Sequence, residues 1–236
     1  MKLRAFLVHL LTASGLIPIM LSVEAVWQDK PQLALIWLAV AMLIDGVDGP
    51  LARRFAVADH LPQIDGAILD HVIDYTGYCV LPALMVYQFG LVPTGYELFA
   101  ACFMLMTSLY VFVHKEAKTA EYDFRGFPAL WNVVAFYMII FESGQWLNLV
   151  VVIFLGIMTF VPVRFIHPFR VVALRRLTVP LLVIWTAMVF SYLFIGRAHF
   201  PAFVDWVFLS FSLYFLMLSA WRSWSLRRTK TEQEQK

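Results

Sequence analysis

Four carboxylates lie at the ends of two strongly apolar segments, at positions 45, 48, 70 and 74. Asp45 and Asp48 are three residues apart, and Asp70 and Asp74 are four apart, so on helices each pair shares one face. An ionised carboxylate at membrane depth is costly, and such residues normally face the protein interior, pair with another group and mark a functional site. The spacing therefore predicts two acidic helix faces that meet across a crevice for cations and a bulky ligand.

The residues around these acids are small, and the acids themselves offer only oxygen atoms as ligands. Gly49 and Ala52 continue the face of the first pair, and Gly66 lies one turn before Asp70. Because no Cys or paired His accompanies the cluster, its oxygen ligands select Mg²⁺ or Mn²⁺ over Zn²⁺. His71 is turned about 100° from its neighbour on a helix, so it does not point at the same ions. The chain also lacks a Rossmann or P-loop phosphate cradle, so metal ions must hold any phosphate.

The elements that position these residues are predicted to be membrane helices. The chain of 236 residues is 61% hydrophobic and only 14% charged, with 21 Phe and 8 Trp, which is typical of polytopic membrane proteins. Apolar windows that approach the span length of about 20 residues cover positions 5–26, 32–52, 67–89, 98–114, 128–141, 146–163, 179–195 and 203–220. We expect an all-α, polytopic integral membrane helical bundle of about eight transmembrane helices. One transmembrane domain is expected over residues 1–222, with a polar cytoplasmic tail over 223–236 and no nucleic-acid module.

The distribution of charge predicts the orientation. With the N-terminus inside and eight spans, 16 of the 18 Lys and Arg residues fall on the cytoplasmic side, and only Lys30 and Arg197 fall outside. That is a strong positive-inside bias. Both termini are therefore predicted to be cytoplasmic, and the acidic crevice opens to the cytoplasm, where nucleotide is available. The apolar run after Arg4 lacks a small-residue cleavage pattern, so we expect a retained first helix and not a signal peptide.

Three further stretches on the predicted cytoplasmic side each allow two interpretations. The run HLLTASG at 9–15 fits close helix packing or the wall of a nucleotide pocket. The aromatic and charged loop at 115–127 fits a linker with an interfacial aromatic belt or a substrate contact. The basic charge of the loop at 164–176 is explained by membrane topology alone, or by contacts of Arg164 and Arg170 with a phosphate or an anionic lipid headgroup.

The acidic pattern also carries a family resemblance. Asp-x2-Asp-Gly-x2-Ala-Arg, a spacer and Gly-x3-Asp-x3-Asp resembles the signature of the CDP-alcohol phosphotransferases, which are integral membrane enzymes. The eight specified residues are all present, as Asp45, Asp48, Gly49, Ala52, Arg53, Gly66, Asp70 and Asp74. The spacer of twelve residues is longer than the commonest form. It resembles the bacterial phosphatidylcholine synthase branch, which condenses free choline with CDP-diacylglycerol. The signature spans residues 45–74 alone, so the rest of the chain needs separate argument.

The resemblance implies a metal-assisted phosphatidyl transfer in a bacterial inner membrane, among membrane lipids. It implies two divalent cations, Mn²⁺ or Mg²⁺, bound by Asp45, Asp48, Asp70 and Asp74. Asp74 is also the implied general base, which takes the proton of the choline hydroxyl as it attacks the β-phosphorus and CMP leaves. Nucleotide binding is implied for the planar fork of Arg53, and for three small residues that leave room for the cytidine, Gly49, Ala52 and Gly66. Dimers are common in the resembled family, so a homodimer is one state that it implies.

The implied acceptor is a quaternary ammonium, which has no hydrogen-bond donor. Its site must therefore use cation–π contacts with aromatic faces, assisted by a nearby carboxylate. Aromatic residues within reach of the predicted crevice include Tyr75, Tyr78, Tyr122, Phe124, Phe127 and Trp131. The step at 124–128 is similar to a Phe-x-Gly-Leu/Phe-Pro step in related enzymes that use CDP-diacylglycerol, which favours a substrate role for this loop.

Two other functions remain open on the sequence. Another CDP-diacylglycerol-dependent phosphatidyltransferase would accept serine, glycerol phosphate or an inositol phosphate. A phosphorylated acceptor would need basic residues such as those at 164–176. A cation-coupled transporter would also hold carboxylates within the membrane. The lack of internal repeats, and the position of the acids near the predicted cytoplasmic helix ends, argue against a transporter.

Overall fold

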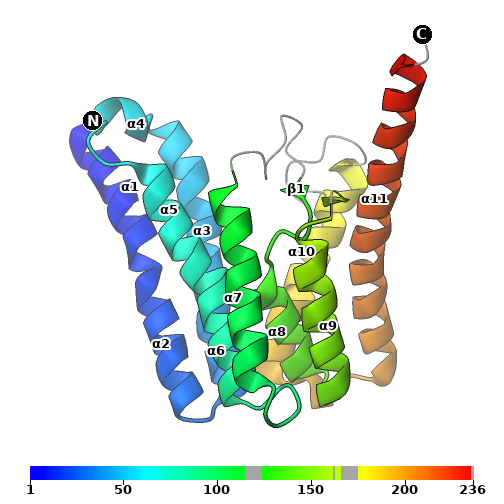
Figure 1. The fold of residues 1–236 in the computed structure, drawn as a ribbon. Helices are drawn as coiled ribbons and strands as arrows, with labels where there is room; N and C mark the ends of the chain where they lie inside the picture. The colour runs from blue at the N-terminus through cyan, green and yellow to red at the C-terminus, as the bar shows by residue number, and fades with distance from the viewer. Residues whose placement is uncertain (115–123, 162, 166–174, 235–236) are drawn as a thin grey trace. The chain divides into compact units, whose positions relative to one another are not determined.

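Helices dominate the structure of this chain. The computed structural model describes residues 1–114, 124–161, 163–165 and 175–234, and Figure 1 shows the order of the elements. Helices suit so apolar a chain because a backbone in lipid must satisfy its hydrogen bonds internally. The chain forms two compact units. Unit one comprises Met1–Phe112 and Ala129–Ile153, and unit two comprises Val113–Pro128 and Phe154–Lys236.

Unit one holds every residue of the acidic signature. Its elements in chain order are α1 (Lys2–Ser14), α2 (Leu16–Trp27), α3 (Pro31–Arg54), α4 (Val57–His60), α5 (Gly66–Tyr75), the π-helical segment η1 (Thr76–Val80), α6 (Leu81–Gln88), α7 (Glu97–Val113), α8 (Trp131–Ile140) and α9 (Gln145–Met158). The last residues of α7 and α9 belong to unit two.

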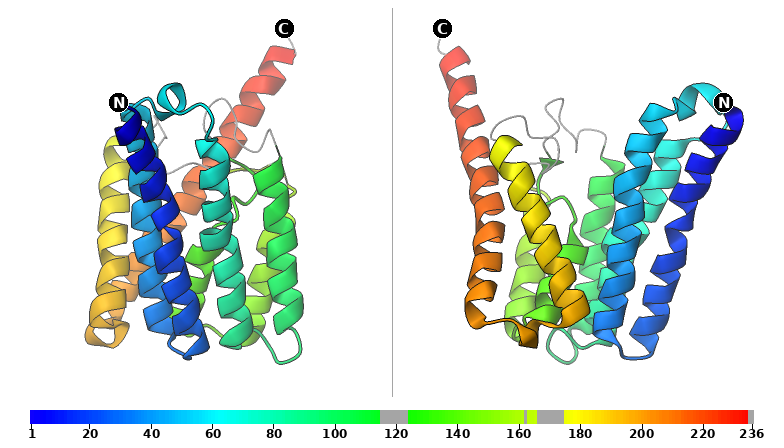
Figure 2. Two further views of the ribbon diagram at one scale, coloured as in Figure 1. Left: turned by 90° about the vertical axis from the view of Figure 1, so that its left-hand side faces the viewer. Right: turned by 180° about the vertical axis from the view of Figure 1, so that it is seen from behind.

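Small residues allow α1, α3 and α5 to approach one another. α1 and α2 follow each other end to end, and α3 runs back beside them (Figures 1 and 2). At the junction, a Cβ added to Gly15 would lie 3.4 Å from a side-chain atom of Ile73 on α5 and 3.9 Å from one of Ile44 on α3. Ser22 of α2 also donates a hydrogen bond to the Ala34 carbonyl of α3 at 2.7 Å. Small residues and interhelical hydrogen bonds of this kind hold helices together in lipid.

A short connection turns α3 into α5 at the end of unit one where the chain begins (Figure 2). α3 ends before Ala56, whose φ of +45° is left-handed and cannot continue a helix. α4 follows and packs on α1. Asp65 then caps α5, because its Oδ1 accepts hydrogen bonds from the N–H groups of Ala67 and Ile68 at 3.0 and 3.1 Å. This cap fixes the start of the helix that carries the second pair of aspartates.

A π-helical turn follows Asp74 almost directly. The segment η1 lies between α5 and α6, and α6 packs on α2 and α8. A Cβ added to Gly77 within η1 would lie 3.4 Å from Ile19 of α2. π-Helical turns change the side-chain register of a helix and are frequent at functional sites.

Buried polar side chains tie the remaining helices of unit one together. Trp131 of α8 is fully buried, and its indole N–H donates to Ser108 Oγ of α7 at 2.7 Å. Asn148 of α9 is also buried and donates to the carbonyl of Leu91, between α6 and α7, at 2.7 Å. Each bond joins segments that are far apart in the sequence.

Unit two contains β1 (Phe124–Arg125), β2 (Arg164–Phe165), α10 (Arg175–Ile195), the 3₁₀ segment η2 (Arg197–His199) and α11 (Ala202–Glu234). β1 and β2 pair antiparallel, with Phe124 opposite Phe165. Gly126 follows β1 with a φ of +83°, and its N–H donates to the Val163 carbonyl at 2.8 Å. A Cβ at this position would overlap the backbone of Thr159. Glycine is therefore required at this step, both for its backbone angle and for space.

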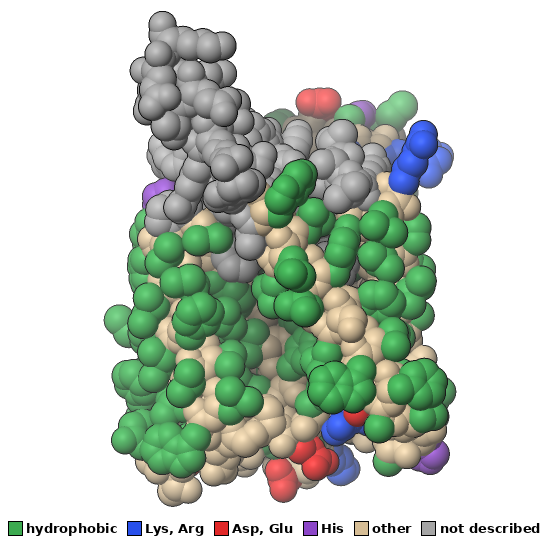
Figure 3. All heavy atoms as spheres, turned by 90° about the vertical axis from the view of Figure 1, so that its right-hand side faces the viewer, with side chains coloured by type: hydrophobic (Ala, Val, Ile, Leu, Met, Phe, Trp, Pro, Cys, Tyr) green, Lys and Arg blue, Asp and Glu red, His purple; other side chains and the backbone are tan. Residues whose placement is uncertain are grey.

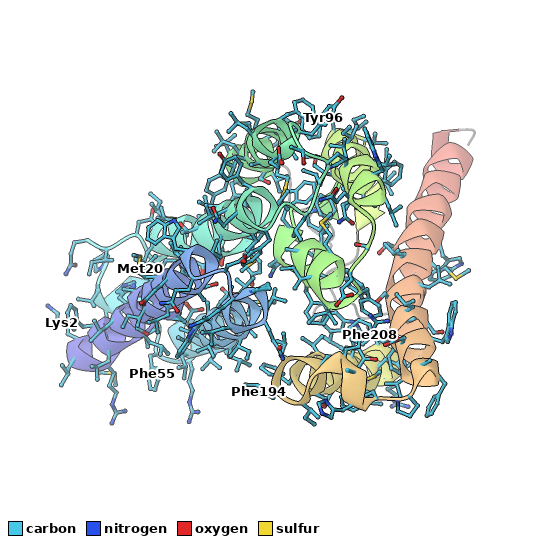
Figure 4. The ribbon with its side chains drawn as sticks, turned by 90° about the horizontal axis from the view of Figure 1, so that it is seen from below. Lys2, Met20, Phe55, Tyr96, Phe194 and Phe208 are labelled. Carbon is cyan, nitrogen blue, oxygen red and sulfur yellow. The ribbon has the colours of Figure 1, made fainter. Side chains whose placement is uncertain are left out.

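α10 and α11 pack through aromatic rings and an ion pair. Phe208 of α11, labelled in Figure 4, is fully buried and stacks against Trp185 and Tyr192 of α10. Asp205 accepts hydrogen bonds from the Tyr192 hydroxyl at 2.8 Å and from Arg197 Nη2 at 2.8 Å. α11 continues as helix to Glu234, so the predicted polar tail is helical over most of its length.

The structure confirms an all-α membrane fold but not the count of eight spans. In the described part of the chain, four stretches are long and apolar enough to cross a membrane: Lys2–Trp27, Pro31–Arg54, Arg176–Ile195 and Ala202–Ser219. Figure 3 shows hydrophobic side chains over most of the described surface of one face. Each of the eight predicted windows contains helix. However, the 10 residues of α8 extend about 15 Å, half of a hydrocarbon core of about 30 Å. The single domain over 1–222 stays a prediction.

Candidate metal and nucleotide site

Three aspartates from two helices gather in unit one. One carboxylate oxygen from each of Asp45 on α3 and Asp70 and Asp74 on α5 lies within 4.8 Å of the other two, and all three residues are partly buried. Carboxylates held this close repel one another when ionised, and a divalent cation between them removes that repulsion. The donors are oxygens, which suits Mg²⁺ or Mn²⁺. The arrangement therefore fits a bound divalent cation.

Asp48, the fourth predicted ligand, lies outside this group of three among the described residues. Three residues advance an α-helix by about 300°, so Asp48 is turned away from Asp45 by about 60°. It is buried, and Thr12 of α1 lies near its carboxylate, with the Thr12 hydroxyl donating to the Val8 carbonyl at 3.2 Å. Thr12 belongs to the run at 9–15, for which the sequence allowed either helix packing or the wall of a nucleotide pocket. The structure places Asp48 where α3 meets α1.

Tyr78 binds one of the three clustered aspartates. Its hydroxyl donates a hydrogen bond to Asp45 Oδ2 at 2.6 Å, which links η1 to α3. The sequence predicted Tyr78 as an aromatic face for choline and missed this contact. A signal for it was present, because Asp70, Asp74 and Tyr78 follow one another at intervals of four residues and so fall near one helix face.

The predicted nucleotide residues line the region where α1, α3 and α5 meet. A Cβ added to Gly66 would lie only 3.0 Å from His9 Cε1 of α1. Ala52 packs against a small apolar cluster formed by Ala5 and Val8 of α1, Val57 of α4 and Leu61 just after α4. A Cβ added to Gly49 would lie 3.5 Å from Arg53 Nη1, so the guanidinium of Arg53 lies over the backbone of its own helix. All three small-residue positions and the arginine therefore belong to the same end of unit one as the aspartates.

The predicted choline residues have diverse environments. The Tyr75 hydroxyl donates to the Leu105 carbonyl at 3.0 Å, and its ring meets Phe112 edge to face at 5.3 Å between centroids. Trp131 is fully buried and hydrogen-bonded to Ser108, so its ring has no exposed face for a ligand. Tyr122 and Arg170 lie outside the described residues, and of Phe124 and Arg164 only the backbone is described.

Comparison with known proteins gives one family. Residues 6–162 match the family model described as CDP-alcohol phosphatidyltransferase. This range includes the whole acidic signature and the helices that surround it in unit one.

Several relatives share one name. A phosphatidylcholine synthase of Mesorhizobium japonicum is 41% identical over 202 residues, which cover 86% of this chain and 75% of the relative. A phosphatidylcholine synthase of Pseudomonas aeruginosa is 39% identical over 224 residues, covering 94% of this chain and 93% of the relative. A phosphatidylcholine synthase of Borreliella burgdorferi is 36% identical over 180 residues, covering 76% of this chain and 77% of the relative.

Proposed function

Because the chain belongs to the CDP-alcohol phosphatidyltransferase family, we propose that it transfers the phosphatidyl group of CDP-diacylglycerol to free choline. The products are phosphatidylcholine and CMP. The observation that carries the proposal is the cluster of Asp45, Asp70 and Asp74, whose oxygens lie within 4.8 Å of one another inside the family signature. The name shared by the relatives supports choline as the acceptor.

We place two divalent cations, Mn²⁺ or Mg²⁺, at the carboxylates of the signature. Asp45, Asp70 and Asp74 already hold their oxygens close together, and Asp48 would supply a further oxygen from the next turn of α3. When bound, the cations would neutralise the pyrophosphate charge that otherwise repels a nucleophile. Tyr78 holds the Asp45 carboxylate through its hydrogen bond. This bond restricts the orientation of that carboxylate.

Asp74 is the proposed general base. The choline hydroxyl oxygen forms a bond to the β-phosphorus, which carries the diacylglycerol. The bond from that phosphorus to the CMP oxygen breaks, and CMP leaves with the electron pair. The hydroxyl proton passes to the Asp74 carboxylate, and a carboxylate is the right type of group for this step.

The small residues of the signature would make room for the cytidine. Gly66 faces His9 so closely that any side chain there would move the imidazole. Gly49 has open space on its own face apart from the Arg53 guanidinium. That guanidinium is exposed and suits a phosphate or nucleotide oxygen.

Choline recognition is proposed to use aromatic faces. A quaternary ammonium accepts no hydrogen bond and donates none, so its attraction to a site comes from ring faces and carboxylates. Tyr75 and Tyr78 lie within one helical turn of Asp74. Their rings would supply the aromatic faces, and Asp74 would supply the carboxylate. Tyr122 and Phe124 remain candidates from the loop of unit two, and the burial of Trp131 favours a packing role for it. Arg164 and Arg170 are proposed to contact the lipid headgroup or its phosphate.

The location follows from the same reasoning. We propose that the signature opens to the cytoplasmic side of a bacterial inner membrane, where CDP-diacylglycerol presents its nucleotide, and the positive-inside bias supports this side. Both termini would then be cytoplasmic. A homodimer stays a prediction from the family.

The decisive experiment is an assay of the purified protein in detergent. Labelled choline, CDP-diacylglycerol and Mn²⁺ should give labelled phosphatidylcholine and one CMP for each lipid formed. EDTA should stop the reaction, and Mn²⁺ or Mg²⁺ should restore it. Transfer that resists the chelator would contradict the metal site.

Parallel assays separate the alternatives. Labelled serine, glycerol phosphate and inositol phosphate should each give far less lipid product than choline. Preferential use of one of them would identify a different phosphatidyltransferase. Ion-driven uptake of a solute into proteoliposomes, with no lipid product, would instead show a transporter.

A further inference from the structure

The imidazole of His9 is buried with one nitrogen unsatisfied. His9 lies on α1 and is 8% exposed, and its Nε2 has no hydrogen-bond partner among the described residues. Buried polar atoms in native proteins almost always have a partner, because an unpaired buried nitrogen loses its hydration without compensation. This nitrogen therefore needs a partner that the described residues do not supply.

The unsatisfied nitrogen belongs to a side chain that touches the signature. The ideal Cβ position of Gly66 is 3.0 Å from His9 Cε1 and 3.6 Å from His9 Nδ1. One turn further along α1, Thr12 lies near Asp48 of α3, and its hydroxyl donates to the Val8 carbonyl. α1 therefore presents two polar residues to α5 and α3, at the end of unit one that holds the aspartates. Gly66 is also the residue proposed above to leave room for the cytidine.

Packing alone does not account for a histidine here. The neighbouring α1 residues Ala5 and Val8 belong to an apolar cluster with Val57 and Leu61. An apolar side chain of similar size at position 9 would extend this cluster without burying an unpaired nitrogen. The polar ring indicates a ligand with a hydrogen-bonding edge.

We propose that His9 binds the cytidine of the nucleotide substrate through Nε2, by a hydrogen bond to the pyrimidine edge or to the ribose 2′-hydroxyl. This inference rests on the proposed function, since it takes the substrate to be a CDP-linked lipid. A neutral imidazole nitrogen either donates or accepts, and cytidine offers both kinds of group at these positions. His9 contacts no reacting atom in this role. It contributes to nucleotide affinity and to the choice of nucleotide.

The test measures CMP binding to the full-length enzyme in detergent with Mg²⁺, by calorimetry. His9→Phe keeps a ring and removes both nitrogens, so CMP affinity should fall about tenfold. The KM for CDP-diacylglycerol should rise by a similar factor while the KM for choline stays unchanged. His60→Phe is the control, because His60 is partly buried and its Nδ1 already contacts the Ala56 carbonyl oxygen at 2.9 Å. It should bind CMP like the wild type.

Two further variants distinguish the loss of the hydrogen bond from misfolding. Gln places its terminal amide near the position of Nε2, whereas Asn places its amide near Nδ1. His9→Gln should therefore retain most of the CMP affinity, and His9→Asn should lose it. Equal affinity in both variants, or unchanged CMP affinity in a folded His9→Phe protein, would overturn the proposal. So would a lower thermal midpoint with nucleotide affinity intact, which is the result expected of packing alone.

Analogues locate the hydrogen bond. If the His9→Phe penalty disappears with UMP, the bond is to the pyrimidine edge, and if it disappears with 2′-deoxy-CMP, the bond is to the ribose. A penalty that persists with both analogues would place the bond on the C2 carbonyl, which cytosine and uracil share, whereas no penalty with any of the three nucleotides would show that the cytidine assignment is wrong. CMP binding needs no acceptor, so this result is independent of whether the enzyme uses choline.

Discussion

The Tyr78 hydroxyl donates a hydrogen bond to Asp45 Oδ2 at 2.6 Å. The bond connects the π-helical segment after α5 with the acidic end of α3. Asp45 shares its cluster with Asp70 and Asp74, so Tyr78 contacts the site from the same helix that supplies two of its carboxylates. Tyr78, which the sequence predicts as a choline-binding ring, therefore also holds the carboxylate of Asp45, a proposed metal ligand.

Removal of this hydroxyl should weaken metal binding. Tyr78→Phe keeps the ring but frees the Asp45 carboxylate, and loss of such an outer contact typically costs about 10–100-fold in metal affinity or activity. The Mn²⁺ concentration for half-maximal activity should rise by at least several-fold, with little change in the KM for choline. Tyr75→Phe is the control, because the Tyr75 hydroxyl binds the Leu105 carbonyl. An unchanged Mn²⁺ requirement in Tyr78→Phe would show that the bond does not hold the ligand.

The parts of the site that follow from local periodicity were predictable from the sequence. Asp70 and Asp74 share a face because they are four residues apart on one helix, and their cluster with Asp45 is present. Gly66 was predicted to leave room for the cytidine, and the structure places His9 of α1 beside it. The helical nature of all eight apolar windows also follows from hydrophobicity, since a membrane-buried backbone has few alternatives.

Contacts between helices were not predictable in the same way. The partner of Tyr78 and the neighbour of Asp48 depend on how α1, α3 and η1 pack, and periodicity along one helix carries no information on this. The π turn of η1 was missed because hydrophobic spacing does not distinguish it from an α-helical turn. The length of α8 was missed because an apolar window shows burial and does not show whether a helix crosses the membrane.

Asp74→Asn should abolish phosphatidyl transfer and leave the protein folded. The amide keeps the size of the side chain but loses both the base and one negative metal ligand. Turnover should fall by at least about a hundredfold, as measured by labelled phosphatidylcholine formed per minute. Asp59→Asn, an exposed residue of α4, should keep full activity. Near-normal turnover in Asp74→Asn would remove Asp74 from the mechanism.

Two glycines on neighbouring helices should respond differently to a methyl group. Gly66→Ala places its Cβ 3.0 Å from His9 Cε1, so the imidazole must move. The KM for CDP-diacylglycerol should rise, while the KM for choline should not. Gly46→Ala meets no atom within 4 Å and should be tolerated, with a small gain in stability because Ala favours helix by about 1 kcal/mol. Equal effects on the two substrates in Gly66→Ala would show that this face does not bind nucleotide.

The ion pair beside the α10–α11 turn should stabilise unit two. Asp205 accepts hydrogen bonds from Tyr192 and Arg197, and Asp205→Ala removes these together. We expect the free energy of unfolding to fall by about 1–3 kcal/mol, seen as a lower thermal midpoint in detergent. Ser210→Ala on the same helix removes only a bond to the Trp206 carbonyl within the helix and should leave the midpoint unchanged. A midpoint equal to that of the wild type in Asp205→Ala would show that the pair contributes nothing.

Acceptor recognition by ring faces is the most direct test of choline as the substrate. A cation–π contact contributes about 0.5–2 kcal/mol, so loss of one ring should raise the choline KM by up to about thirtyfold. Tyr75→Ala or Tyr78→Ala should show this rise, whereas Tyr75→Phe, which keeps the face, should not. Serine and ethanolamine should be poor acceptors because they lack the methyl groups that contact the rings. Normal choline KM values in both Ala variants, together with loss of acceptor binding in Arg164→Ala, would indicate an anionic acceptor in place of choline.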